Sequence, residues 1–275
     1  MATNIHSTAV VDGAARLGQD VSVGPYAVVE ADVTVGDRCE LMAGAILHRY
    51  TSLGPDNRVG PYCVLGGVPQ DHKFDPAGET LLRIGAGNVF REYVTISRAT
   101  AAGAATVIGD GCFFMTQSHV GHDSTVADGA ILTNNAAVAG HCEIGSGAYL
   151  SGNAVVHQYC WVGELSIMRG NAGVSQHVPP FVMVMANNFI VGLNAVGLRR
   201  ANGISDEDRR QIKRAYRLLY REGLTPEKAL ARMDACDDWA PPAGRFRDFV
   251  RRVVQAKPPF NRGLVTASAA QRRGG

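Results

Sequence analysis

Charge, aromatic side chains and long apolar runs are all scarce in this chain. Only 19% of its 275 residues are charged and 7% are aromatic, whereas 46% are hydrophobic. So apolar a composition excludes an intrinsically disordered protein. No run of 18 apolar residues occurs, so we expect no membrane span. The opening MATNIHSTAVVDG lacks the basic start and apolar core of a secretory signal, which predicts a cytoplasmic location.

Lysine is nearly absent. Arginine outnumbers it 23 to 4, and Lys73 is the only lysine before residue 200. The formal net charge of +2 argues against a nucleic-acid-binding protein. The charge is unevenly distributed, since residues 1–200 carry 11 basic and 16 acidic side chains and residues 201–275 carry 16 and 9. This asymmetry predicts two differently charged parts that join near residue 200.

Glycine, in contrast, is abundant and accompanies a six-residue repeat. The chain has 32 glycines, about 12% against a usual ~7%. A large apolar residue recurs every six positions from Ile5 to Leu65, from Ile84 to Ile96 and from Ile108 to Val174, which makes 26 hexads. A small or apolar residue stands four positions after most of them. We attribute the glycine that often follows the large residue to turns that need its permissive φ.

This repeat predicts a parallel β-helix. One large side chain per hexad would point into a narrow core, and the small residue would lie at a tight corner. The pattern resembles the left-handed β-helix, in which three hexads make one triangular coil, so 26 hexads correspond to between eight and nine coils. Five of the six cysteines fall in the small-residue column, so we interpret them as packing residues and not as a disulfide or metal set. These five are Cys39, Cys63, Cys112, Cys142 and Cys160.

The repeat defines the domain organisation. It occupies residues 1–190 and is interrupted by polar excursions at 66–83 and 98–106, of the kind that often bind substrates or partners. Residues 191–262 show helical spacing, which predicts a C-terminal α-helical domain, and we expect 263–275 to be a disordered tail. The predicted fold class is an all-β left-handed parallel β-helix with a C-terminal α-helical domain.

Within the predicted helical domain, two helix starts can be placed. Ser205 is followed by three acidic residues, which favour the first turn of a helix. Thr225, which is followed by proline and glutamate, predicts the start of a second, shorter helix, and Gly223 can end the helix before it. Apolar residues at helical spacing from Phe246 to Val253 predict a third helix.

Three histidines fall on one face of the predicted solenoid. His122, His141 and His157 belong to hexads that start 18 residues apart, one coil each, and none lies in the two inward columns. His177 would extend the same face, and the excursion at 66–83 would leave from the same side.

Three interpretations of these histidines remain open. They can be ordinary surface residues. They could bind zinc, as three histidines do in the γ-class carbonic anhydrases of this fold, although His119-x-x-His122 does not match that ligand pattern. They could also act in general acid–base catalysis, with the adjacent Asp123 orienting the His122 ring. Ser118 and Ser124 are not convincing nucleophiles, because both fall in the small-residue column.

Several longer segments are distinctive. They are GGVPQDHKF (66–74), MTQSHVGHDSTV (115–126), NNAAVAGHCEIG (134–145), AVVHQYCWVG (154–163), GVSQHVPPFV (173–182), GLRRANG (197–203), AYRLLYREGLT (215–225) and NRGL (261–264). In these segments, and over nearly its whole length, the chain resembles the UDP-N-acetylglucosamine O-acyltransferases of lipid A biosynthesis, a family of hexapeptide-repeat acyltransferases.

The resemblance implies a homotrimer with active sites in the clefts between neighbouring prisms. It implies transfer of an R-3-hydroxyacyl chain from the phosphopantetheine of acyl carrier protein to the 3-hydroxyl of UDP-N-acetylglucosamine, with no further cofactor and no metal. Such a reaction needs a base for the hydroxyl and hydrogen-bond donors for the developing oxyanion. The basic C-terminal part would suit docking of the acidic carrier protein, although a solvated helical face would look the same.

The resemblance also assigns site residues. His122 is implied as the general base, Asp123 as its carboxylate partner, and Gly140 as the backbone N–H donor to the oxyanion. The implied substrate-binding residues are Asp71, Lys73, His119, His141, His157, Gln158, Gly170, Asn194 and Arg200. The last two belong to the uridine-diphosphate side. Gly170 occupies the position that limits acyl length in the family, and glycine there favours a longer chain.

Some positions depart from the family pattern, among them Ser97, Asn188, Val196 and Ala201. The catalytic segment is kept while the substrate side differs, so the acceptor is the open question. An alternative is a related acyltransferase that uses another nucleotide sugar, such as a 3-amino sugar, or acetyl-CoA as the donor. A non-catalytic β-helix scaffold or a γ-type metal site is a further alternative.

Overall fold

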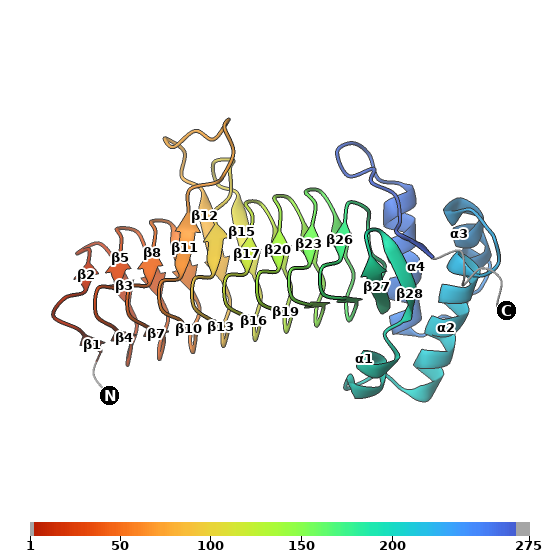
Figure 1. Ribbon diagram of the computed structural model, residues 1–275, viewed down its shortest axis with the longest axis horizontal. Helices are drawn as coiled ribbons and strands as arrows, with labels where there is room; N and C mark the ends of the chain where they lie inside the picture. The colour runs from red at the N-terminus through yellow and green to blue at the C-terminus, as the bar shows by residue number, and fades with distance from the viewer. Residues whose placement is uncertain (1–2, 268–275) are drawn as a thin grey trace.

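A computed structural model describes residues 3–267 of the chain. Its main body is an elongated three-sided prism of short parallel strands, and helices cover one end (Figure 1). The chain visits the three faces in turn, so each strand of the prism pairs with strands one coil away. Within residues 3–267, no helix is long and apolar enough to cross a membrane.

The three faces are named A, B and C in the order in which the chain visits them. Face A is formed by β1 (Asn4–Ile5), β4 (Ser22–Val23), β7 (Glu40–Leu41), β10 (Arg58–Val59), β13 (Val89–Phe90), β16 (Phe113–Phe114), β19 (Ile131–Leu132), β22 (Tyr149–Leu150), β25 (Ile167–Met168), β27 (Val182–Ala186), β28 (Phe189–Leu193) and β29 (Thr266–Ala267). Face B is formed by β2 (Val10–Val11), β5 (Val28–Val29), β8 (Ile46–Leu47), β11 (Val64–Gly67), β14 (Thr95–Ser97), β17 (His119–Val120), β20 (Ala137–Val138), β23 (Val155–Val156) and β26 (Gly173–Val174). Face C is formed by β3 (Arg16–Leu17), β6 (Thr34–Val35), β9 (Thr51–Leu53), β12 (Leu81–Ile84), β15 (Ala105–Ile108), β18 (Thr125–Val126), β21 (Glu143–Ile144) and β24 (Trp161–Val162).

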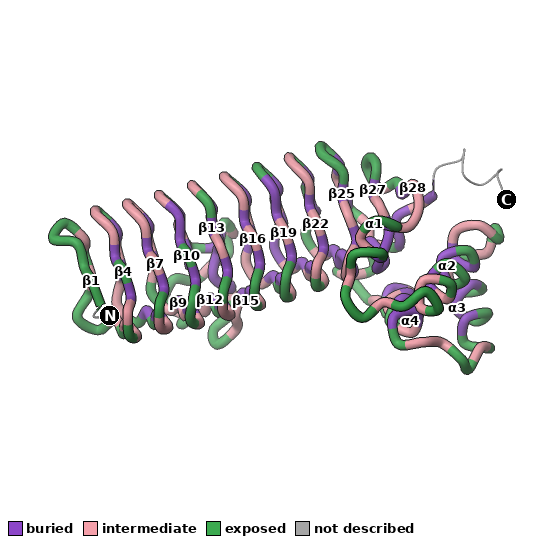
Figure 2. Tube along the Cα trace, turned by 90° about the horizontal axis from the view of Figure 1, so that it is seen from below, coloured by how far each residue is buried: buried purple, intermediate pink, exposed green. Residues whose placement is uncertain are grey.

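The six-residue repeat builds this prism as predicted. The large residue of each hexad lies on a strand and points inward, and from Val23 to Val174 these side chains are at most 5% exposed. Pairing partners lie 18 residues apart in uninterrupted coils, as for Val120 and Val138. Figure 2 shows the buried stretches recurring in successive coils after β1. Fully burying each such side chain contributes about 1.5–3 kcal/mol, so the stacked column is the main source of stability.

The glycine directly after the large residue has a different role from the expected one, whereas other glycines of the repeat, such as Gly44 (φ 68°), do take the left-handed turn position. The left-handed backbone conformation falls on the third residue after the large one, where other residue types often stand, such as Asp20 (φ 58°) and Tyr62 (φ 57°). The glycine directly after the large residue lies where neighbouring coils come closest. A Cβ on Gly36 would lie 2.6 Å from the carbonyl carbon of Gly54 in the next coil. This glycine therefore reflects close backbone approach and not turn conformation.

The cysteines of the small-residue column are buried packing residues, as predicted. The Sγ of Cys63 lies 2.8 Å from the carbonyl oxygen of Arg91, and that of Cys142 lies 3.1 Å from the carbonyl oxygen of His157. Burial raises the pKa of both thiols to about 12. Thiols that stay protonated and enclosed behave as small apolar side chains.

Both excursions leave the prism at the edge between faces B and C. Residues 68–80 connect β11 to β12, and residues 98–104 connect β14 to β15 (Figure 1). The buried Arg98 joins the two, because its guanidinium donates to Oγ1 of Thr80 at 3.1 Å and to the carbonyl oxygen of Gly66 at 3.3 Å. The two loops are therefore held together above this edge.

The C-terminal part begins with an antiparallel hairpin of β27 and β28. The helices that follow are α1 (Ala195–Arg200), α2 (Asp206–Tyr220), α3 (Pro226–Asp234) and α4 (Pro241–Val254). Ser205 caps α2 through a capping box with Asp208, and Thr225 caps α3, so both predicted helix starts are confirmed. The hairpin and α1 were not predicted, because neither is long enough to show a period of its own.

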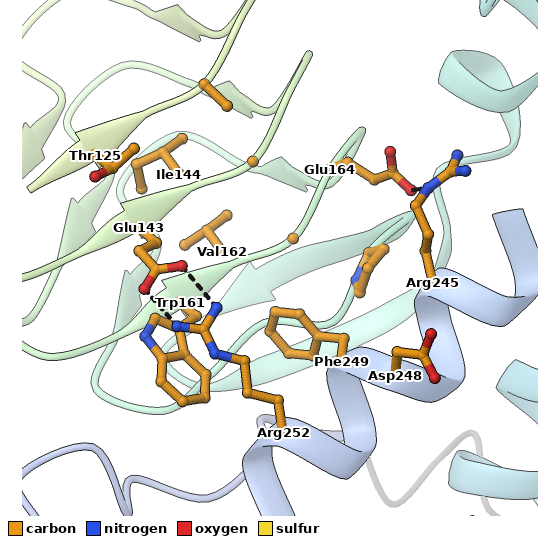
Figure 3. A pocket seen from close by; sticks show the side chains of 14 residues that line it. Thr125, Glu143, Ile144, Trp161, Val162, Glu164, Arg245, Asp248, Phe249 and Arg252 are labelled. Atoms are coloured by element: carbon orange, nitrogen blue, oxygen red, sulfur yellow. Dashed lines mark hydrogen bonds and ion pairs between the residues drawn. The ribbon is translucent and has the colours of Figure 1, made fainter. Parts of the chain in front are cut away.

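Helix α4 packs against face C at the end of the prism (Figure 3). Arg252 forms a two-pronged ion pair with Glu143 and lies 3.6 Å above the ring of Trp161, while Arg245 lies 2.5 Å from Glu164. A cavity of about 410 Å³ remains between helix and sheet. Paired charges around an apolar contact thus fix the helices to the last coils.

The end of the chain returns to the prism. We expected residues 263–275 to be disordered, and those after residue 267 lie outside the described part of the chain. The earlier ones are ordered, since β29 pairs with β28 and Leu264 pairs with His177. The expectation was wrong for residues 263–267, because Leu264 and Val265 are apolar and buried, and the backbone of this segment pairs with β28 and with His177. We call residues 257–265 the C-terminal strap.

His177 anchors this strap and does not extend the exposed histidine face. It is fully buried. Its Nδ1 accepts a hydrogen bond from the backbone N–H of Trp161 at 3.0 Å, and its Nε2 lies 2.6 Å from the carbonyl oxygen of Phe260. Since Nδ1 accepts, Nε2 carries the proton and donates to Phe260.

Replacing Gly36 with alanine should destabilise the prism, because the new methyl group would collide with the backbone of the next coil. We expect a loss of about 1–3 kcal/mol in the free energy of unfolding, measured by chemical denaturation. Gly13→Ala is the matched control, since a Cβ there would meet nothing within 4 Å. Equal losses in the two variants would contradict the close-approach explanation.

Candidate active site

The structure brings the three histidines to one edge of the prism, where faces B and C meet. His122, His141 and His157 occupy the turns after β17, β20 and β23, which are neighbouring strands of face B. The ring centroids of His122 and His141 lie 5.1 Å apart. The 68–80 loop leaves from the same edge, as predicted.

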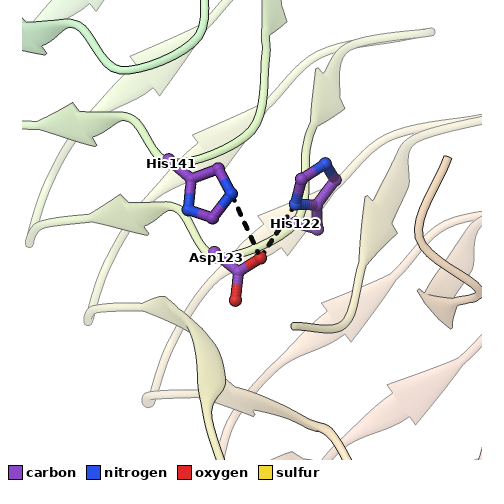
Figure 4. A group of neighbouring side chains, drawn as sticks. All are labelled: His122, Asp123 and His141. Carbon is purple, nitrogen blue, oxygen red and sulfur yellow. Dashed lines mark hydrogen bonds and ion pairs between the residues drawn. The ribbon is translucent and has the colours of Figure 1, made fainter. Parts of the chain in front are cut away.

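His122 and Asp123 form a hydrogen-bonded pair (Figure 4). Nδ1 of His122 lies 2.8 Å from Oδ2 of Asp123, and the two side chains are only 14% and 13% exposed. An ionised carboxylate can only accept, so Nδ1 carries the proton and Nε2 of the neutral ring keeps a free lone pair. That nitrogen is the atom able to take a proton from a hydroxyl group.

Asp123 is held in place by the second excursion. Thr100 donates to its carboxylate from Oγ1 at 2.7 Å and from the backbone N–H at 3.1 Å. Burial alone raises the pKa of Asp123, but the hydrogen bonds from His122 and Thr100 outweigh it and leave the pKa below its ordinary 3.8. Asp123 is therefore ionised at neutral pH and able to orient the base.

His141 lies beside the same carboxylate. Its Nε2 is 3.7 Å from Oδ2 of Asp123, beyond hydrogen-bond distance. Its ring meets His122 edge to face and lies flat against Tyr159, with centroids 4.7 Å apart and an interplanar angle of 8°. Burial lowers the pKa of His141 below its ordinary 6.5, against the opposing attraction of Asp123. His141 is therefore neutral at pH 7.

The same three side chains could also be considered as metal ligands. Ligand atoms of His122, Asp123 and His141 all lie within 4.8 Å of one another. The carboxylate is already engaged by Thr100 and His122, however, and Nε2 of His122 points away from it (Figure 4). The chemistry of this donor set therefore fits a hydrogen-bonded acid–base pair better than a metal centre.

A groove of about 370 Å³ opens beside the pair. Among the residues that line it are His119, His122, Gly140 and Gln158, together with Gln70 from the first loop and Ser97. Only glycine at position 140 fits the observed position of the His122 ring, because a Cβ there would lie 2.6 Å from Cε1 of His122. Burial lowers the pKa of His119, whose Nδ1 lies 2.8 Å from Oγ1 of Thr95. The groove thus combines a base, a neutral histidine and the turn that contains Gly140.

Other predicted residues lie near this groove. Gln158 lines it, whereas the adjacent His157 is exposed. Asp71 on the first loop is close enough to act electrostatically on His141, and Lys73 is exposed on the same loop.

Gly170, Asn194 and Arg200 lie away from His122 on the same chain. Gly170 follows β25, so it occupies the edge between faces A and B. Asn194 caps α1, where its side chain accepts from the backbone N–H of Gly197 and donates to the carbonyl of Leu165. The exposed Arg200 ends that helix. Gly170 therefore lies on a different edge of the prism from His122, and Asn194 and Arg200 lie in the C-terminal part, beyond the hairpin.

The departing positions have different surroundings. Asn188 takes up the left-handed turn of the hairpin (φ 58°) and bonds the backbone N–H and the hydroxyl of Ser175, at 2.8 and 2.9 Å. Ser97 is buried at the groove, and Ala201 is the C-cap of α1. Val196 is 47% exposed, and nothing in the structure explains it.

Sequence reasoning missed Thr100, Gln70 and Tyr159. Thr100 and Gln70 lie in the excursions, where no period indicates which side chain turns back to the prism. Tyr159 had a usable signal, because it lies one coil after His141 in the same turn position. The 18-residue register could have found it.

A β-helix of hexads with a histidine–carboxylate pair at a groove on one edge defines a hexapeptide-repeat acyltransferase. A family model described as bacterial transferase hexapeptide (six repeats) matches residues 14–49. A second, described as UDP N-acetylglucosamine O-acyltransferase, domain 2, matches residues 177–265.

Curated relatives define the family more closely. The acyl-[acyl-carrier-protein]--UDP-N-acetylglucosamine O-acyltransferases of Thermodesulfovibrio yellowstonii and Halorhodospira halophila are 39% and 42% identical to the chain. Each alignment covers 82% of this chain and 88% of the relative. The chain belongs to the UDP-N-acetylglucosamine O-acyltransferase family.

Solved structures agree. The Bacteroides fragilis UDP-N-acetylglucosamine acyltransferase is 32% identical, with a TM-score of 0.87, and the match covers 95% of this chain and 99% of that one. The Francisella novicida enzyme is 30% identical, with a TM-score of 0.89 and coverage of 97% and 95%. The predicted fold class, a left-handed parallel β-helix with a helical C-terminal domain, is confirmed.

Gly140→Ala should abolish turnover without unfolding the protein. The new methyl group would displace the His122 ring, which can rotate away at small cost to the fold but then no longer faces the groove. We expect at least a hundredfold loss in kcat, comparable to removing a general base. Transfer kinetics and thermal unfolding check this, with Gly13→Ala as the control. A variant that retains its activity would show that the ring tolerates a second position.

Proposed function

We propose that the chain transfers an R-3-hydroxyacyl group from the phosphopantetheine of acyl carrier protein to the 3-hydroxyl of UDP-N-acetylglucosamine, in lipid A biosynthesis. The observation that carries this proposal is the hydrogen-bonded pair of His122 and Asp123. Its unprotonated nitrogen is Nε2 of His122, and His122 lines the groove. Family membership indicates the substrates, and the pair supplies the chemistry.

In the proposed reaction, Nε2 of His122 removes the proton of the sugar hydroxyl while the hydroxyl oxygen attacks the thioester carbonyl carbon. Asp123 stabilises the imidazolium that results. The backbone N–H of Gly140 is the proposed donor to the oxyanion of the tetrahedral intermediate. Collapse of this intermediate breaks the C–S bond, and the departing thiolate takes the proton back from His122. A thioester is already activated, so the reaction requires no covalent enzyme intermediate.

A homotrimer would complete this site. Outward-facing residues of face B are largely apolar, including Val10 (63% exposed) and Val155 (48% exposed). Face A presents Phe113, Ile131 and Ile167 outward in its C-terminal half. Two different apolar faces on one copy suit a head-to-tail contact that closes into a ring.

Such a contact explains the division of the predicted site residues. Face A of one copy against face B of the next would bring Gly170 and Arg200 of the one towards His122 of the other. We infer that acyl-chain length and the uridine diphosphate are read by a second copy. On this proposal, Gly170 and Arg200 lie far from His122 within one chain because they serve the site of a neighbouring copy.

The helical end suits the acyl carrier protein. Residues 201–275 carry 16 basic and 9 acidic side chains. Part of the basic surplus remains after ion pairs such as Arg251 with Asp234. A basic surface speeds and orients the docking of an acidic partner. A cytoplasmic location, where this partner would be met, stays a prediction.

Purified protein should convert UDP-N-acetylglucosamine to a singly acylated product when offered a mixed pool of 3-hydroxyacyl carrier proteins, and His122→Ala should not. Mass spectrometry of the nucleotide sugar reads out product and chain length together. We expect the variant to lose at least a hundredfold in kcat and to keep its oligomeric state, since His122 is outside the core. A 3-amino acceptor that is acylated in preference to UDP-N-acetylglucosamine would overturn the assigned acceptor.

Co-expression of His122→Ala with Arg200→Ala should restore activity that each variant lacks. In randomly mixed trimers, about a quarter of the sites would combine an intact His122 edge with an intact Arg200 from the neighbour. His122→Ala with Asp123→Asn is the matched control, because both changes lie on the same edge and no combination repairs it. Restoration by neither pair would show that the site is built within one chain.

A further inference from the structure

A column of stacked side chains connects the catalytic pair to the end of the chain. Asp123, His141 and Tyr159 occupy the same turn position in three consecutive coils, all with a left-handed backbone (φ 57°, 59° and 64°). Their side chains therefore project in the same direction, one above another. His141 lies between the carboxylate, 3.7 Å from its Nε2, and the ring of Tyr159, whose centroid is 4.7 Å away.

The far side of Tyr159 is covered by the C-terminal strap. Phe260 meets its ring edge to face at 5.3 Å, and the guanidinium of Arg262 lies 5.8 Å from its centroid. Phe260 is fixed in turn by His177 at 2.6 Å and by stacking on Trp161 at 5.5 Å. Tyr159 is thus enclosed between His141 and a segment about a hundred residues later in the chain.

We propose that Tyr159 is a positioning residue which, held by the C-terminal strap, fixes the ring of His141 so that Asp123 stays bonded to His122. The geometry shows why this is needed. His122 already bonds the Oδ2 atom of Asp123 at 2.8 Å, and Nε2 of His141 is closest to that same atom. A freely rotating or protonated His141 would compete for this oxygen and draw Asp123 away from the base.

The charged surroundings of His141 favour such competition once the ring is freed. Asp123 and Asp71 attract a proton to it, while His122 opposes this. Arg262 faces it only across Tyr159. Burial, to which the flat contact with Tyr159 contributes, keeps His141 neutral against the two carboxylates. A smaller side chain at position 159 would admit water and shift that balance.

The test compares Tyr159→Phe with Tyr159→Leu, and it rests on the proposed function for its kinetic part. Tyr159→Phe keeps the flat ring and should stay within about twofold of the parent in kcat/KM at every pH. Tyr159→Leu should lose about tenfold near pH 6 and recover near pH 8.5, because the acid limb of its profile moves up by about one unit. Phe260→Leu, which loosens the strap, should shift the limb in the same direction. A loss that is equal at all pH values would indicate a merely structural role and overturn the proposal.

An NMR titration of histidine-labelled protein provides a readout that needs no substrate. The His141 resonance should titrate about one unit higher in Tyr159→Leu and unchanged in Tyr159→Phe. If the parent protein fails to acylate UDP-N-acetylglucosamine, the proposed function fails while this titration still decides the positioning role. A His141 pKa that is the same in all three proteins would contradict the proposal whatever the activity.

Discussion

The structure depends on a steric constraint: the interior of the prism admits one large side chain per strand. Because three short strands close a coil, each position of an uninterrupted coil recurs on the same edge 18 residues later. In each hexad, the large core residue and the small residue are fixed by packing, and the turn residues between them can carry functional side chains. Which edge a residue reaches is fixed by its hexad, and which way it points is fixed by its place in the turn.

The site follows from this arrangement. The left-handed turn position carries Asp123 and His141, residue types that tolerate positive φ better than most. The position before it carries His122 and Gly140, and the glycine leaves room for the imidazole of the coil below. A carboxylate, a base and a backbone N–H donor are therefore placed together by adjacent coils, without a loop that folds around them. The loops add Thr100, which fixes the acid from outside.

Much of this could be predicted from one sequence, because a strict period leaves few alternatives. The core column, the common edge of His122 and His141 and the exit of the first loop all follow from counting in sixes. Three features did not follow. The glycine after each large residue is assigned to a turn from its φ freedom, whereas its close approach to the next coil appears only in three dimensions. His177 continues the count but is buried, because the strap that covers it comes from another part of the chain. Thr100 was missed because loops have no period.

The strap also sets the order in which the protein becomes complete. Coils pair with neighbours about 18 residues away, so the prism can grow rung by rung behind the ribosome. The contact between His177 and Phe260 spans 83 residues and waits for almost the last part of the chain. A nascent chain that lacks the strap would therefore have its coils in place, but Tyr159, and through it His141, would not yet be held beside the catalytic pair. The catalytic edge is therefore fully assembled only after the last residues of the strap have been synthesised.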